Sequence, residues 1–307
     1  MLSRIAEALF WIGRYVERAD DTARILDTHL HVLLEDSWID EDLACRSLLS
    51  VMGNPASAEK ISRNRVVEVL VDDATSPSSI VGSLGAAREN ARRARETVST
   101  EMWQALNTTW TALPSVRRNA VSVHEVLAWV RERSAMVAGV ADSTMSRDDC
   151  WHFMALGRSL ERADMTARLI AMRAIESGPS WTHLMRSCGA YQAFLRTYRG
   201  AASDENAAEF LLLDRLFPRS VFAALTRAET CLERLEPASG RVGVQDQARR
   251  VLGRVRTGLE YRGALDLLDD LPAEMERIQQ ACSEASETVS RRYFPRGATT
   301  WVSEAAS

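Results

Sequence analysis

Glu17 and Glu161 are carboxylates that could take part in chemistry, because each lies in a charged segment that occurs twice. Residues 13–24 read GRYVERADDTAR and residues 157–168 read GRSLERADMTAR, so nine of twelve positions are identical at an offset of 144. A positioned carboxylate can orient or deprotonate an amine. An arginine guanidinium binds a carboxylate or phosphate through paired N–H groups. The segments therefore combine candidate general bases with candidate anion-binding groups.

We take Glu17 and Glu161 as the candidate catalytic residues. The candidate substrate-binding residues in the two segments are Arg14, Asp20, Arg24, Arg158, Asp164 and Arg168. Within the first segment, Arg14 can reach Glu17 at i+3 and Asp20 can reach Arg24 at i+4 on a helix.

A third group of arginines lies outside the repeated segments. Arg88, Arg92 and Arg95 share one face of an expected helix, and they could bind an acidic partner or a phosphate. The alternative is an exposed helix whose arginines pair with neighbouring glutamates.

The identical positions of the two segments are mostly charged or small, whereas apolar ones have changed, as in Val16 and Leu160. Packing alone favours the reverse, because a core needs hydrophobic volume and surface polarity usually varies freely. Three interpretations stay open: a solvated helix face, a structural network of paired charges, or a ligand or catalytic site where Glu17 and Glu161 meet. For the last, an anion fits better than a metal, because arginine is abundant and the Glu-x-x-His pattern is missing.

Gly13 and Gly157 share the face of the repeated glutamates. A glycine inside a helix costs ~1 kcal/mol relative to alanine. Its presence in both segments predicts that a backbone or a ligand approaches this face closely. The five histidines show no ligand-like spacing, and we expect no metal site.

The elements that must position these residues are helices. The chain of 307 residues holds 15 glycines and 8 prolines, and 46% of its residues are hydrophobic. Alternating strand patterns are absent, whereas helical spacing recurs, which predicts an all-α fold. One long helix is expected from Ser79 to about Leu113, ending before Pro114.

A second pair of segments extends the repeat. Residues 70–80 align with residues 211–221 at an offset of 141, and Asp, Pro and Ser recur at matching places. Two blocks in the same order predict a tandem duplication of a helical-bundle unit. We expect residues 1–143 and residues 144–307 to form two halves, related by a pseudo-two-fold axis and packed as one compact unit.

Composition excludes several classes of function. The net charge of −4 argues against binding of nucleic acid, which needs a basic surface. No uncharged apolar stretch reaches the ~18 residues of a membrane span, no secretory pattern opens the chain, and five cysteines are scattered, so we expect a cytoplasmic protein. No P-loop pattern occurs, which predicts that any nucleotide chemistry belongs to another chain.

The sequence resembles the bacterial alpha-E domain proteins at residues 2–20, 87–107, 157–168 and 213–220, and the resemblance covers nearly the whole chain. It implies an all-helical protein encoded beside, or fused to, a circularly permuted ATP-grasp ligase. A transglutaminase-like protein and a proteasome-like peptidase are further neighbours that it implies. This setting implies a role in ATP-dependent formation of amide bonds on a small peptide.

The leading hypothesis is a helical partner or accessory subunit of an ATP-grasp amide ligase that binds an anionic substrate. It has no cofactor of its own, and ATP and Mg²⁺ are expected on the ligase. The alternatives are a stand-alone enzyme with a carboxylate and arginine site in the bundle, or a purely structural scaffold. The chain's status as an enzyme and its oligomeric state are left open by the sequence.

Overall fold

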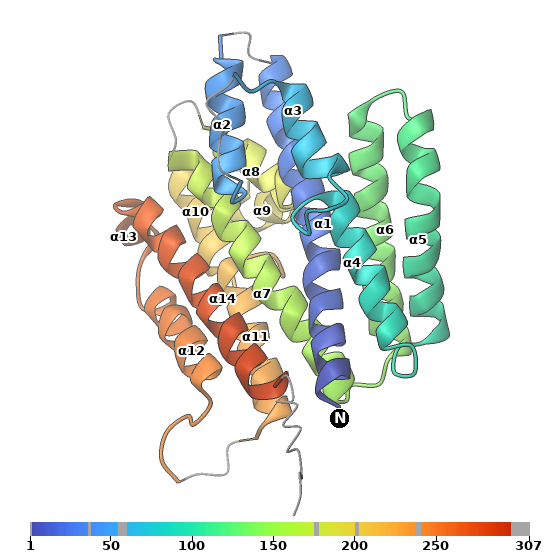
Figure 1. The fold of residues 1–307 in the computed structure, drawn as a ribbon. Coiled ribbons are helices and arrows are strands. Elements are labelled where there is room, and N and C mark those ends of the chain that lie inside the picture. The colour runs from blue at the N-terminus through green and yellow to red at the C-terminus, as the bar shows by residue number, and fades with distance from the viewer. Residues whose placement is uncertain are drawn as a thin grey trace, which may run out of the picture.

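The computed structural model describes residues 2–35, 38–54, 60–174, 178–199, 203–237 and 241–295. Within these ranges the chain is helical and contains no strand, which confirms the all-α fold (Figure 1). The α-helices are α1 (Ser3–Glu35), α2 (Glu41–Val51), α3 (Arg63–Val67), α4 (Ile80–Arg93), α5 (Thr100–Asn119), α6 (Val123–Thr144), α7 (Asp149–Ala171), α8 (Trp181–Ser187), α9 (Tyr191–Tyr198), α10 (Asp204–Leu213), α11 (Val221–Leu235), α12 (Gln247–Glu260), α13 (Ala264–Leu268) and α14 (Leu271–Tyr293). A π-helical turn, Glu68–Asp72, follows α3, and a 3₁₀ turn, Met172–Ala174, follows α7.

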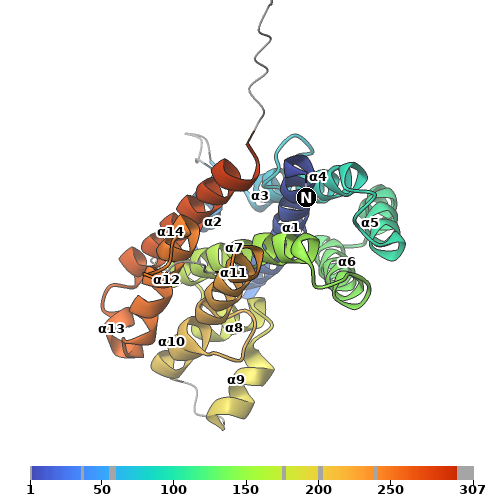
Figure 2. The same ribbon diagram turned by 90° about the horizontal axis from the view of Figure 1, so that it is seen from below.

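The two helices that carry the repeated charges, α1 and α7, pack against each other at the centre of the molecule (Figure 2). On one side, α4 and α6 pack on α1, and α5 covers α4 and α6. On the other side, α11 and α14 pack on α7, and α12 covers α11 and α14. The repeated segments therefore lie where the two groups of helices meet.

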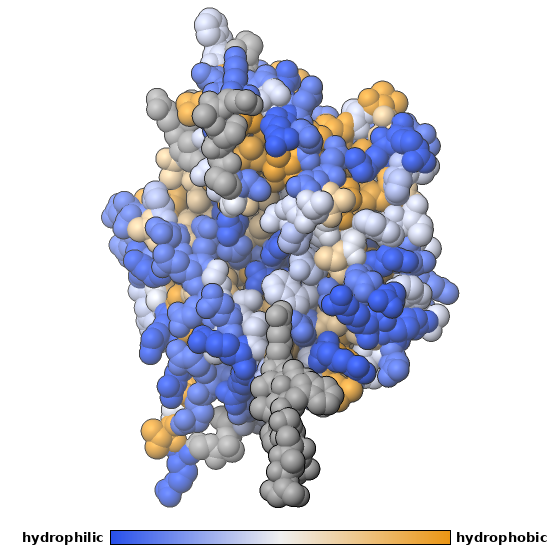
Figure 3. Space-filling view, in the orientation of Figure 1, coloured by the Kyte–Doolittle hydropathy of each residue, from blue (hydrophilic) through white to orange (hydrophobic). Residues whose placement is uncertain are grey.

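Burial matches this arrangement. The buried hydrophobic side chains of both groups form a single core cluster, to which α1 and α7 contribute throughout their lengths. Hydrophilic side chains cover most of the face drawn in Figure 3, and hydrophobic ones gather in its upper part, near α2 and α3.

A serine is the N-cap of each helix that begins at the end of the aligned segments 70–80 and 211–221. Ser79 accepts a hydrogen bond from the backbone N–H of Gly82 at the start of α4, and Ser220 does the same for Ala223 at the start of α11. Such caps satisfy amide donors that the first helical turn leaves unpaired. The recurring serine thus fixes where both helices begin.

The prediction of one long helix from Ser79 to Leu113 is wrong. Helix α4 ends at Arg93, and Ser99 caps a separate helix, α5, by accepting from the N–H of Met102. Helix α5 then continues through Pro114, whose ring lies on its exposed side. Proline removes one intrahelical hydrogen bond, and on the exposed side water can satisfy the carbonyl that loses its donor.

The expected boundary between residues 143 and 144 lies in the last turn of α6, and α7 begins at Asp149.

None of the helices in the described ranges has the length and apolar character that a membrane crossing needs.

Candidate functional site

Two glycines allow α1 and α7 to touch through their backbones. A Cβ atom on Gly13 would lie 2.0 Å from the carbonyl oxygen of Met154, and one on Gly157 would lie 2.0 Å from that of Phe10. Both distances are far below van der Waals contact, so neither position has room for a side chain. The close neighbour that the two glycines predict is therefore the backbone of the partner helix.

Glu161 on α7 binds two arginines of α1. Arg14 Nε donates to Glu161 Oε2 over 2.6 Å. Arg18 donates from Nε to Oε1 over 2.5 Å and from Nη2 to Oε2 over 3.0 Å. Only 1% of the Glu161 side chain is exposed, so two guanidinium groups neutralise a fully buried carboxylate.

Glu17 on α1 has the reciprocal arrangement. Arg162 on α7 donates from Nε to Glu17 Oε1 over 2.6 Å and from Nη2 to Oε2 over 2.9 Å. Arg219, from the turn before α11, places Nη1 3.0 Å from Glu17 Oε1. The side chain of Glu17 is 4% exposed. Each glutamate therefore pairs with the arginine that follows the other glutamate in sequence.

We call Arg14, Glu17, Arg18, Glu161, Arg162 and Arg219 the ion-pair cluster. All four oxygens of its two carboxylates contact guanidinium nitrogens. Burial opposes ionisation of both glutamates, but the adjacent arginines outweigh it and lower each pKa to about 2. Both glutamates are therefore ionised at neutral pH, and each of their oxygens already contacts a guanidinium group.

Arg219 also extends the cluster to two aspartates of α1. It donates to Asp20 and to Asp21, which are both buried. Burial raises the pKa of Asp21 to about 8, and the charges of Glu17 and Asp20 add to this rise against the opposing effect of Arg219. Asp20 Oδ1 and Asp21 Oδ2 are buried oxygens with no hydrogen-bond partner among the described residues.

The aspartates one turn beyond each glutamate pair within their own helices. Arg24 Nε lies 3.0 Å from Asp20 Oδ2, and Arg168 Nε lies 2.8 Å from Asp164 Oδ2. The i,i+4 pair predicted from the first segment is thus confirmed, and the second segment repeats it. Arg168 also donates to the backbone oxygen of Val51 over 2.7 Å, which attaches the end of α2 to α7.

One expectation for the arginines is wrong. Arg14 pairs with Glu161 of the other helix instead of with Glu17, because the contact of α1 with α7 brings Glu161 within 2.6 Å of its Nε. Arg158, the counterpart of Arg14, donates to Asp142 near the end of α6 over 3.3 Å and stays outside the ion-pair cluster.

The arginines at 88–95 do not act as one group. The guanidiniums of Arg88 and Arg95 lie over the ring of Trp103, at 5.8 Å and 5.7 Å from its centroid. Arg92 instead donates twice to Glu89, over 2.9 Å and 2.8 Å, and its side chain is 61% exposed. The structure therefore favours the alternative of an exposed pair for Arg92.

Arg219 is the main residue of the cluster that sequence reasoning missed. It stands at the position where the first repeated block has Ser78, so the aligned blocks show it as a difference instead of an identity. Arg219 reaches the cluster because the turn before α11 packs against α1. No spacing in the sequence predicts that contact.

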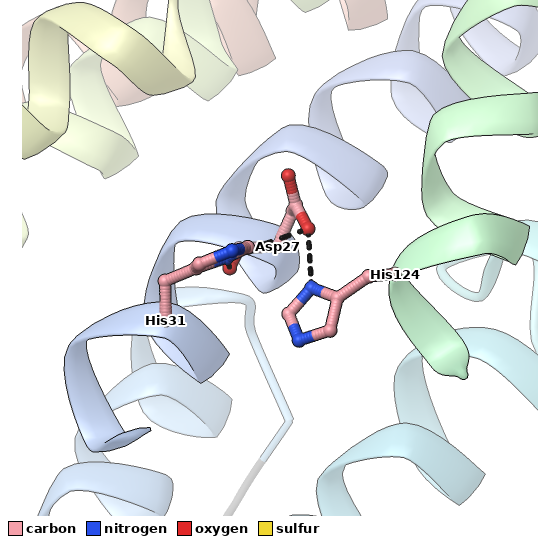
Figure 4. Close-up of side chains that lie close together, drawn as sticks. All are labelled: Asp27, His31 and His124. Carbon is pink, nitrogen blue, oxygen red and sulfur yellow. Dashed lines mark hydrogen bonds and ion pairs between the residues drawn. The ribbon is translucent and has the colours of Figure 1, made fainter. Parts of the chain in front are cut away.

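Among the residues that the structure describes, two groups of side chains have the types and distances of metal ligands. Glu17, Asp20 and Asp21 offer oxygens within 4.8 Å of one another, but Arg219 contacts all three and already supplies the positive charge. The other group, Asp27, His31 and His124, lies on the surface where α1 meets α6 (Figure 4). Sequence reasoning missed this second group. Only the i,i+4 spacing of Asp27 and His31 hints at it.

Comparison with known proteins adds a family match. A model of the Alpha-E family, described as a predicted alpha-helical domain with a conserved ER motif, matches residues 1–294. Uncharacterized protein Rv2567 of Mycobacterium tuberculosis and Uncharacterized protein Mb2597 of Mycobacterium bovis are each 25% identical over 308 residues, which is 91% of this chain and 34% of theirs. The chain thus spans about a third of the length of these curated relatives. No solved structure matches the chain.

Proposed function

The chain belongs to the Alpha-E family, and on this premise we propose that it is a non-catalytic helical partner of an ATP-grasp amide ligase. One observation carries the non-catalytic part. All four carboxylate oxygens of Glu17 and Glu161 contact guanidinium nitrogens, and the two side chains are only 4% and 1% exposed, so a substrate could reach them only by displacing an arginine. The repeated charges then serve to hold α1 and α7 together.

The ligase as partner is proposed from the family resemblance. The length of the mycobacterial relatives supports it, because the matching unit there is joined to further sequence about twice its own length. In this proposal ATP and Mg²⁺ bind to the ligase, a transglutaminase-like protein is a further partner, and the place of action is the cytoplasm, where ATP is available.

We also propose that residues 1–143 and 144–307 are duplicated halves related by a pseudo-two-fold axis. Reciprocal contacts support this. Arg18 and Arg162 each bind the glutamate of the other helix, and each also directs Nη1 to a backbone oxygen, that of Pro77 at 3.3 Å and that of Pro218 at 3.4 Å. We take the Glu-Arg pairs at 17–18 and 161–162 as the ER motif of the family description, because the arginine of each pair binds the glutamate of the other.

An anionic substrate, if presented by this chain, would contact it away from the ion-pair cluster. A surface hollow of about 550 Å³ lies between the start of α1 and the end of α4. Its lining includes three arginines and two aromatic side chains, namely Arg4, Arg92, Arg93, Trp11 and Tyr15. Guanidinium groups beside aromatic rings suit a carboxylate or phosphate carried on an organic molecule. Glu7 also lines the hollow, and Arg92 and Arg93 already contact Glu89, so an incoming anion would compete with these carboxylates for the arginines.

The test compares product formation by the neighbouring ligase with and without this chain, using mass spectrometry. We expect Glu17→Gln and Glu161→Gln proteins to support full product formation at a temperature where circular dichroism shows them folded. A folded variant that still binds the ligase but abolishes the product would overturn the non-catalytic role.

A second candidate is an enzyme in its own right, and one observation favours it. Asp21 has a pKa raised to about 8 and a buried oxygen without a partner, and perturbed buried carboxyls are common at active sites. The adjacent cavity has a volume of only about 10 Å³, enough for at most a single water molecule. Native mass spectrometry of the purified protein would reveal a bound small molecule if this candidate holds.

A further inference from the structure

We propose that Asp27, His31 and His124 bind a divalent first-row transition metal, with zinc as the representative ion, on the surface where α1 meets α6. Asp27 and His31 lie one turn apart on α1, so helical periodicity places both on one side. His124 is in the first turn of α6, 97 residues further along the chain than Asp27. Figure 4 shows the two imidazoles converging on the Asp27 carboxylate from the two helices.

The distances suit a shared ion. The Nδ1 atom of His124 lies 2.6 Å from Asp27 Oδ1, and the Nδ1 atom of His31 lies 3.6 Å from the same oxygen. The ring centroids of the histidines are 4.3 Å apart, and one ligand atom from each of the three residues lies within 4.8 Å of the others. Ligands bonded to one zinc at about 2.1 Å are roughly 3 to 3.5 Å apart. Coordination therefore requires His124 Nδ1 and Asp27 Oδ1 to move apart by up to about 1 Å, and His31 Nδ1 to exchange its 2.8 Å contact with the backbone oxygen of Asp27 for the ion.

The ligand types select the class of metal. Two neutral imidazole nitrogens and one carboxylate oxygen suit Zn²⁺, Co²⁺, Ni²⁺ or Cu²⁺, whereas Mg²⁺ and Ca²⁺ prefer oxygen ligands alone. A metal ion here would take the place of the proton that His124 shares with Asp27. Because the side chain of His31 is 51% exposed, water can complete the coordination shell.

Arg131 binds the second oxygen of the Asp27 carboxylate. Its Nη1 lies 3.3 Å from Asp27 Oδ2, the oxygen that does not contact His124. Ligating carboxylates commonly have such an outer hydrogen-bond partner, which fixes their orientation. The positive charge of Arg131 weakens affinity for a cation, so we expect a site of modest strength instead of a permanently filled one.

The ion would connect two helices that no covalent bond links. Helix α6 packs directly on α1, so a metal bridge between Asp27 and His124 restrains the separation of the two helices. Zinc that binds the folded chain and not the unfolded chain stabilises the folded state. We therefore expect zinc to raise the melting temperature of the protein.

The test measures zinc binding by calorimetry after the full-length protein has been treated with a chelator. We expect one Zn²⁺ per chain. His31→Ala, His124→Ala and Asp27→Asn should each weaken binding by about tenfold or more, since loss of a ligand exceeds loss of an outer partner. The matched control is His183→Ala. Within the described part of the chain, His183 pairs with a single carboxylate, that of Glu35, through Nε2 at 3.3 Å, and the substitution should leave zinc affinity unchanged.

A spectroscopic arm keeps the proposal testable if a variant is unstable. Co²⁺ added to the parent protein should give a ligand-field absorption spectrum, and the spectrum should disappear in a folded Asp27→Asn protein, which preserves the side-chain shape. Absence of stoichiometric binding, or equal binding by the three variants and the control, would overturn the site. Neither result bears on the ligase partnership, because these residues lie outside the ion-pair cluster.

Discussion

Each repeated glutamate forms ion pairs with arginines outside its own helix. Glu161 binds the arginines of α1, and Glu17 binds Arg162 of α7 together with Arg219. An isolated carboxylate buried to this extent would be protonated, so ionisation here depends on the arginines. This dependence explains why the charges stay identical between the two segments while the neighbouring apolar residues differ.

Glu17→Gln and Glu161→Gln should each lower the free energy of unfolding by about 3 to 5 kcal/mol. Each change leaves guanidinium groups largely buried without their counter-charge. Urea unfolding followed by circular dichroism measures the loss. The control is Glu132→Gln, since Glu132 precedes an arginine as both cluster glutamates do but is exposed on α6, and its effect should stay within about 0.5 kcal/mol. Equal effects at the three positions would contradict the structural role.

Gly13→Ala and Gly157→Ala should each destabilise the protein by about 1 to 3 kcal/mol, or more, because the added Cβ would meet a carbonyl oxygen 2.0 Å away. Gly139→Ala is the control within α6, where a Cβ meets nothing within 4 Å. There the better helix propensity of alanine should stabilise the protein by up to about 1 kcal/mol. Opposite signs in thermal unfolding would support the backbone contact, and a gain in stability at Gly13 would refute it.

At the scale of helices, Arg219 makes the two ends of the ion-pair cluster unlike. It reaches from the turn before α11 to Glu17, Asp20 and Asp21 of α1. In the aligned segments Ser78 stands in place of Arg219, and Met165 stands in place of Asp21. Asp21 of the first half and Arg219 of the second therefore form a pair at one end of the cluster, whereas Met165 and Ser78 occupy the equivalent positions at the other end.

This pattern predicts strong coupling between the two positions. Arg219→Ser alone should destabilise the protein by about 3 to 5 kcal/mol, since it leaves Glu17, Asp20 and Asp21 buried without the guanidinium that they share. Adding Asp21→Met should restore about 1 to 3 kcal/mol of that loss. A double-mutant cycle in urea measures the coupling. Additive effects of the two changes would show that Asp21 and Arg219 act independently.

At the scale of the whole molecule, the buried carboxyls set how stability depends on pH. Glu17 and Glu161 have folded-state pKa values of about 2, below the usual 4.5. Their contribution is therefore complete above pH 4.5 and is lost as the pH falls from 4.5 toward 2. The double variant Glu17→Gln, Glu161→Gln should show a flatter decline across this window in urea unfolding at fixed salt. A decline as steep as that of the parent protein would assign acid unfolding to other carboxyls.

Asp21 should act in the opposite direction. Its pKa rises from 3.8 to about 8 on folding, so its contribution is complete below pH 3.8 and is lost as the pH rises toward 8. Asp21→Asn keeps the shape of the side chain and cannot ionise. The variant should therefore gain stability relative to the parent protein as the pH increases from 5 to 8. A constant difference between the two proteins over this range would argue against a protonated Asp21.

The sequence by itself determined the features that depend on local periodicity. The abundance of helix formers gave the all-α class, recurring serines mark the starts of α4 and α11, and the i,i+4 spacing of Asp20 and Arg24 gave their ion pair. The two glycines predicted a close approach on the face of the glutamates, and α1 and α7 make that approach.

Only the tertiary structure decided which charges meet. Glu161 binds Arg14, Glu17 binds Arg162, Arg219 binds Asp21, and Asp27 contacts His124. Each of these contacts joins residues more than 90 positions apart. Helical periodicity fixes the neighbours of a residue within its own helix. Its neighbours on other helices depend on which surfaces pack and at what angle, and that follows from the burial of the whole core.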